Sequence, residues 1–126
     1  MTKRSLAAGA ILFFAGSLIL FAANRPEQTW QGYVTDTYCG FNRVNKAPTA
    51  SCTLECVKKE HAKYAFFNFA DKKVYILNPQ AETAKYAGKT VTVKGTIVGL
   101  AKFATGKGPS AGAIITASSI TPETSK

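Results

Sequence analysis

The stretch Lys89-Thr-Val-Thr-Val-Lys-Gly-Thr-Ile-Val98 carries the clearest structural signal in this chain. Val91 and Val93 alternate with threonine and lysine, so one side of the segment is apolar and the other is polar. Successive side chains of a β-strand point to opposite faces, and the pattern therefore predicts a half-buried strand. Gly95 interrupts the alternation, which is typical of a bulge or of a bend in a barrel strand.

Shorter patterns on both sides of this segment predict four more strands and two short helices. The strands are expected over Trp30–Asp36, Tyr64–Phe69, Lys73–Leu77, Lys89–Val98 and Ala113–Ile120, and the helices over about Cys52–His61 and Pro79–Tyr86. Thr49 or Ser51 is a suitable N-cap for the first helix. Pro79 suits the first helical position of the second, and Gly88 ends that helix.

A helix between the third and fourth of five short strands is the order of an OB-type barrel. The sequence therefore predicts a mainly β fold with two short helices: a small five-stranded OB-like barrel over residues 28–121, with a flexible tail over residues 122–126. The cysteine-bearing helix is then an insertion between the first two strands. An SH3-like or other open β-roll is the alternative.

The N-terminus has the layout of a secretory signal. Lys3 and Arg4 precede Leu6–Ala23, which holds 18 residues without a charge. A cut after Ala23 places Phe21, a large residue, at position −3, where signal peptidase prefers a small one. As a helix, the apolar segment would span about 27 Å, just short of a bilayer core of roughly 30 Å. Residues 1–24 are therefore expected to form an apolar helix that is either a cleaved signal peptide or a retained anchor in contact with the membrane.

Length and charge limit the classes of function. A chain of 126 residues is one domain's worth, which argues against a large multidomain enzyme. Without Lys3 and Arg4, 14 lysines and arginines remain against 7 acidic residues, a net charge of about +7. Such a charge permits acidic partners. Export to the periplasm or cell envelope argues against nucleic acid as a partner. Anionic envelope components are one interpretation of the charge, and lysines that only keep an exported domain soluble are the other, so the sequence does not identify a partner.

The cysteines Cys39, Cys52 and Cys56 all fall in one stretch. In an exported protein the default expectation is a disulfide, and an odd number leaves one thiol over. Cys52 and Cys56 lie on one face of the predicted helix, with parallel Cβ directions that make a bond between them awkward. A bridge from Cys39 to either Cys52 or Cys56 is expected, and it would tie the first strand to the helix.

A metal site is the alternative interpretation of Cys39, Cys52 and Cys56, since three thiolates favour Zn²⁺ or Cu(I). Asp36 and His61 are weaker candidates for a fourth ligand. His61 follows Cys56 by five residues, which turns it about 140° away on the same helix. A thiol-redox role is a third reading, and it requires a thiol whose pKa is lowered.

Several segments together resemble a group of small exported bacterial β-barrel proteins of unknown function. They are Gly32–Asp36, Cys39-Gly40, Cys52–Cys56, Lys63-Tyr64, Val74-Tyr75 and Tyr86–Thr96, and the resemblance covers about residues 28–121. It implies export and a small OB-like barrel. Members of the group carry a CGxxH pattern, and Arg43 stands here in place of the histidine.

A glycine-rich segment over Gly99–Gly112 is expected to be a flexible loop between the last two strands. In an OB-type barrel that loop borders the binding face, so Lys102, Phe103 and Lys107 are candidate ligand contacts. No catalytic motif is evident: the single histidine has no nucleophile-elbow motif near it, and the carboxylates are scattered. The sequence thus predicts an exported binding or structural module without enzymatic activity.

Overall fold

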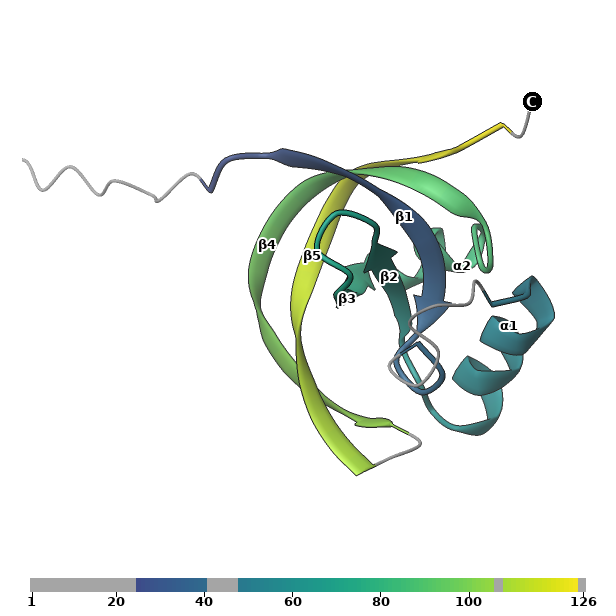
Figure 1. Ribbon diagram of the computed structural model, residues 1–126. Coiled ribbons are helices and arrows are strands. Elements are labelled where there is room, and N and C mark those ends of the chain that lie inside the picture. The colour runs from purple at the N-terminus through teal and green to yellow at the C-terminus, as the bar shows by residue number, and fades with distance from the viewer. Residues whose placement is uncertain (1–24, 41–47, 106–107, 125–126) are drawn as a thin grey trace, which may run out of the picture.

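The computed structural model describes residues 25–40, 48–105 and 108–124 (Figure 1). The elements are β1 (Gln28–Asp36), α1 (Ala50–Lys59), β2 (Tyr64–Asn68), β3 (Val74–Asn78), α2 (Gln80–Ala84), β4 (Thr90–Thr105) and β5 (Gly108–Pro122). This order and the mainly β character confirm the prediction of strands with two short helices. The apolar helix expected over residues 1–24 lies outside the described residues.

The five strands form one mixed sheet. β1 pairs with both β2 and β4, and the pairs β2–β3 and β4–β5 are also antiparallel. β3 and β5 are parallel. The order is β1-β2-β3-β5-β4, and because β1 also bonds to β4, the pairings close into a ring. In Figure 1 the long β4 and β5 curve side by side around the shorter β2 and β3, and α1 lies beyond the end of β1.

The larger of two buried apolar clusters lies on the inner side of this sheet. Its fully buried side chains are Val34, Phe66, Leu77, Val91, Val93 and Ile115. Every strand contributes, as the alternating patterns require. The predicted apolar face of Val91 and Val93 is confirmed, since both are buried. The expected irregularity at Gly95 is also present: the β4–β5 register shifts between Lys94 and Gly95, and again between Ile97 and Gly99.

The prediction of a loop over Gly99–Gly112 is wrong. β4 continues to Thr105 and pairs with β5 up to Gly108, so most of the segment is a β-hairpin. The glycines fit the strands instead of breaking them. A Cβ on Gly112 would lie 3.1 Å from the ring of Phe103, so the missing side chain makes room for that ring. Gly99 stands where the second register shift realigns the two strands.

Both helices begin close to the predicted positions. Thr49 is the N-cap of α1, and its side chain accepts a hydrogen bond from the Cys52 backbone N–H. Pro79 directly precedes α2 instead of occupying its first turn. Across residues 25–40, 48–105 and 108–124, no helix combines the length and the apolar character needed to cross a membrane.

Gln80 fastens α2 to the sheet. Its Oε1 accepts from the Tyr64 backbone N–H at 2.7 Å, and its Nε2 donates to the backbone oxygens of Tyr64 and Leu77, both at 2.9 Å.

Near the C-terminus, β5 extends to Pro122, one residue into the expected tail. The Glu123 backbone N–H donates to the Thr90 oxygen at 2.9 Å, which holds the chain against β4.

Candidate cysteine site

The three cysteines converge from two segments of the chain. Cys39 lies in the turn after β1, whereas Cys52 and Cys56 lie one helical turn apart on α1. All three sulfur atoms lie within 4.8 Å of one another. The Sγ atoms of Cys39 and Cys56 are 2.8 Å apart. The predicted grouping of Cys39 with the two helical cysteines is therefore the arrangement found, with all three as partly buried free thiols.

Asp36 fixes the turn that presents Cys39. Its side chain is fully buried, and Oδ1 accepts from the backbone N–H groups of Tyr38 at 2.8 Å and Cys39 at 2.7 Å. The Gly40 N–H donates to the Asp36 backbone oxygen at 3.0 Å. A Cβ on Gly40 would lie 2.4 Å from that oxygen, so this tight turn requires glycine. The carboxylate therefore positions Cys39 through hydrogen bonds to the backbone of the turn.

Backbone contacts at both ends hold α1 over the end of β1. At its beginning, Gly88 packs so closely that an added Cβ would lie 2.5 Å from the Ala50 nitrogen. After its end, the Lys63 N–H donates to Thr37 Oγ1 at 3.0 Å, and the Thr37 N–H donates to the Lys63 oxygen at 2.9 Å. The helix is thereby placed with its two cysteines facing the turn that holds Cys39.

The surroundings of the cluster oppose thiolate formation. Burial raises the pKa of the Cys56 thiol well above its ordinary value, and the Cys39 hydrogen bond and the Asp36 charge raise it further. Burial also raises the pKa of Cys39, although its hydrogen bond with Cys56 partly offsets the rise. A redox nucleophile needs a lowered pKa, so these two thiols are poorly suited to that role.

The weaker ligand candidates lie outside the group of converging ligand atoms. Within the described chain that group holds the three cysteines and includes neither Asp36 nor His61. α1 ends at Lys59, and His61 follows it as an exposed residue with a left-handed backbone (φ 53°). Among the expected ligand contacts, Lys102 and Phe103 lie on β4 in the hairpin, and Lys107 lies outside the described residues.

The separation of the Cys39 and Cys56 sulfur atoms can be compared with the sulfur separations in a disulfide and in a zinc site. A disulfide places its sulfur atoms about 2.0 Å apart. Two thiolates on a tetrahedral zinc ion, with Zn–S bonds of about 2.3 Å, lie about 3.8 Å apart. The Cys39–Cys56 separation of 2.8 Å falls between these values and nearer to the disulfide. In the structure Cys39 and Cys56 are thiols in contact and are not bonded to each other, and Cys52 is the third sulfur beside them.

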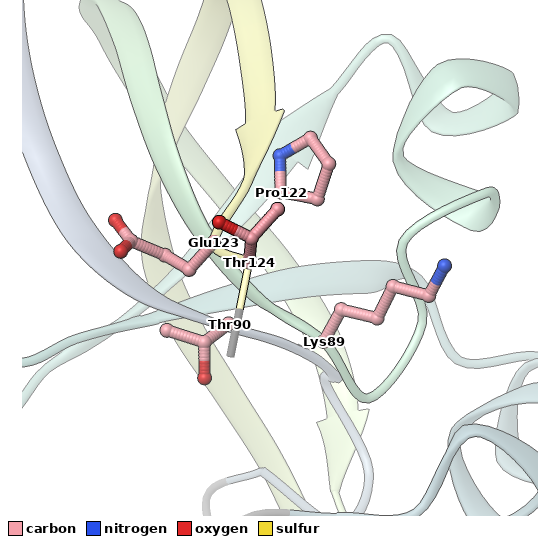
Figure 2. A pocket seen from close by; sticks show the side chains of 5 residues that line it. All are labelled: Lys89, Thr90, Pro122, Glu123 and Thr124. Carbon is pink, nitrogen blue, oxygen red and sulfur yellow. The ribbon is translucent and has the colours of Figure 1, made fainter. Parts of the chain in front are cut away.

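A separate surface hollow of about 750 Å³ lies where β4 begins and β5 ends (Figure 2). It is lined by Lys89, Thr90, Pro122, Glu123 and Thr124. Figure 2 shows the Lys89 and Glu123 side chains extending away from each other. Glu123 is engaged by the Thr92 hydroxyl, which donates to Oε1 at 2.7 Å. Because these polar groups do not converge, the hollow lacks the arrangement expected of a ligand site.

Comparison with known protein families, curated proteins and solved structures finds no match for this chain.

Proposed function

We propose that this protein is an exported binding module built on an OB-type barrel, in which a Cys39–Cys56 disulfide joins the end of β1 to α1. The strand order β1-β2-β3-β5-β4, the parallel β3–β5 pair and the position of α2 between β3 and β4 support the OB assignment. The charged start followed by Leu6–Ala23 supports export to the periplasm or cell envelope.

The observation that carries the disulfide is the 2.8 Å separation of the Cys39 and Cys56 sulfur atoms. Oxidation would replace two S–H bonds by one S–S bond and pass two protons and two electrons to the oxidant of an export compartment. The bridge would close a loop between positions 17 residues apart. In the chain-entropy model such a loop is worth about 3 kcal/mol, a large share of the stability of a small domain.

Thermal unfolding of three serine variants tests the bridge. Cys39→Ser and Cys56→Ser should each lower the melting temperature by roughly 10–20 °C, and reductant should not lower it further. Cys52→Ser is the matched control, since it lies on the same helix and leaves the bridge intact. It should keep both the melting temperature and its sensitivity to reductant. A Cys52→Ser variant as unstable as the other two would contradict the proposed pairing.

Soft-metal binding is the second candidate function, because the cluster holds one sulfur more than a bridge requires. All three Sγ atoms lie within 4.8 Å, and the buried Asp36 places a negative charge beside Cys39 and Cys56. Three thiolates near a carboxylate favour a cation, and their softness favours Zn²⁺ or Cu(I). The same variants separate the two functions. If the protein binds metal, the reduced protein incubated with Zn²⁺ or Cu(I) should hold one equivalent of that metal, and the Cys52→Ser variant should lose it.

A further inference from the structure

The β4–β5 hairpin extends past the part of the sheet that β3 covers. β3 pairs with β5 over Ile76–Asn78, opposite residues 114–116. β4 and β5 remain paired much further, until Thr105 and Gly108. The overhang lies beside the first residues of β3, whereas α2 follows the other end of that strand. Figure 1 shows this part of the hairpin curving below β3.

The core side of the sheet continues onto the overhang. Ile115 is fully buried in the core, and Ala113 and Ala111 follow it on the same side of β5 because strand side chains alternate. Leu100 is the partner of Ala113 in the β4–β5 ladder and so faces the same way. Its side chain is nevertheless 78% exposed. An apolar surface that is continuous with the core therefore opens to solvent.

A groove of about 410 Å³ lies on this surface. It is lined by Lys72, Lys73, Val74, Tyr75, Leu100, Ala111, Gly112 and Ala113. Its volume falls within the usual range for small-molecule sites, and the mouth of a barrel is a common place for one. The small residues of β5 leave the space open, while Leu100 and Tyr75 supply larger apolar surfaces.

Lysines outnumber carboxylates at and beside the groove. Lys72 and Lys73 are the charged residues of its lining. Asp71, next to them in the turn, accepts a hydrogen bond from the Tyr75 hydroxyl. Lys102 is the ladder partner of Ala111, which places a third lysine on the same side of the hairpin. The groove thus combines an apolar floor with cations at its edge.

We propose that this groove binds a single-chain amphipathic carboxylate, with the apolar chain over Leu100 and Tyr75 and the carboxylate near Lys72 and Lys73. The volume suits one chain better than a two-chain lipid, and the lysines select a negative head over a neutral or positive one. This inference rests on the proposed function, since it names the ligand class of the binding module. It uses a surface separate from the cysteine cluster.

Titration of the full-length protein with decanoate, followed by amide NMR shifts, tests the groove. We expect saturable shifts in Tyr75, Leu100 and residues 111–113. Decyltrimethylammonium has the same chain with the opposite charge and should bind at least tenfold more weakly. Equal affinity for the two ions, or shifts spread over the whole surface, would overturn the proposal.

Matched variants locate the two parts of the site. Leu100→Gln and the double variant Lys72→Gln/Lys73→Gln should each weaken decanoate binding about tenfold, and both change exposed residues. Leu54→Gln and Lys58→Gln/Lys63→Gln alter an exposed leucine and two exposed lysines elsewhere and should leave binding unchanged. Equal losses of decanoate affinity in the groove variants and the control variants would overturn the proposed site.

The experiments can reject the Cys39–Cys56 bridge and the groove independently. A protein whose bridge is confirmed but which gives no decanoate shifts rejects the groove alone. Saturable decanoate binding in a protein without a bridge rejects the Cys39–Cys56 disulfide and supports the groove.

Discussion

At the scale of single residues, Asp36 shows what the sequence reveals and what it hides. The sequence singles it out as a polar residue near the cysteines, but as a possible metal ligand. In the structure it is buried and holds the backbone N–H groups of Tyr38 and Cys39. The spacing of an aspartate three residues before the cysteine is typical of such a turn. The convergence of Cys39 with α1 depends on long-range packing, which local patterns do not contain.

Gly32 gives a prediction at this scale. A Cβ there would lie 1.9 Å from the backbone oxygen of Phe67 and 2.7 Å from the Phe66 ring. Gly32→Ala forces strands β1 and β2 apart, and we expect a loss of about 2–3 kcal/mol in the free energy of unfolding. Gly99→Ala is the control, because nothing lies within 4 Å of its added Cβ. Urea unfolding compares the two, and equal losses would contradict this account of the β1–β2 contact.

At the scale of elements, the alternating strand over residues 89–98 was predictable because one face meets the core and the other meets water. The β4–β5 hairpin was not predictable in the same way. Its glycines at positions 99, 108 and 112 are typical of loops, yet ladder pairing and the Phe103 ring beside Gly112 accommodate them in strands. Partners distant in sequence thus overrode local propensity.

Gln80 gives the prediction at the element scale. Its side-chain amide bonds to the backbone of Tyr64 and Leu77, so it joins α2 to β2 and β3. Gln80→Ala leaves these partly buried backbone groups without that partner, and we expect a loss of about 1–3 kcal/mol in the free energy of unfolding. Lys85→Ala breaks only the exposed pair with Glu82 and should cost little. Chemical denaturation of both variants checks the difference. A loss in unfolding free energy for Gln80→Ala as small as that for Lys85→Ala would contradict the role of Gln80.

At the scale of the whole molecule, the order of strands and helices followed from the sequence, since each element carries its own pattern. The groove at the overhang did not, because it depends on how far β4 and β5 run beside each other past β3. Leu100 illustrates this: its sequence neighbours indicate a loop, and only the ladder to Ala113 aligns it with the core face. Export stays a prediction from Leu6–Ala23.

Stability at high pH is a property of the whole fold. Burial and the Asp71 hydrogen bond raise the pKa of Tyr75 from 10.0 to about 12, and burial also raises the pKa of Tyr33. The unfolded chain therefore loses these protons first as the pH rises. The contribution of Tyr75 to stability is present below pH 10 and is lost between about pH 10 and 12. Unfolding free energies across this range should fall, and less steeply for Tyr75→Phe. An identical slope in that variant would argue against the Tyr75 contribution.

A Cys39–Cys56 bridge in an exported module is tested by the intact mass of the exported protein. The protein is denatured and alkylated without reductant, and a second sample is reduced first. We expect one added label without reductant and three after reduction, with the free thiol of the unreduced protein on Cys52. The unlabelled mass also shows whether the segment ending at Ala23 has been removed. Three labels without reductant would contradict the bridge.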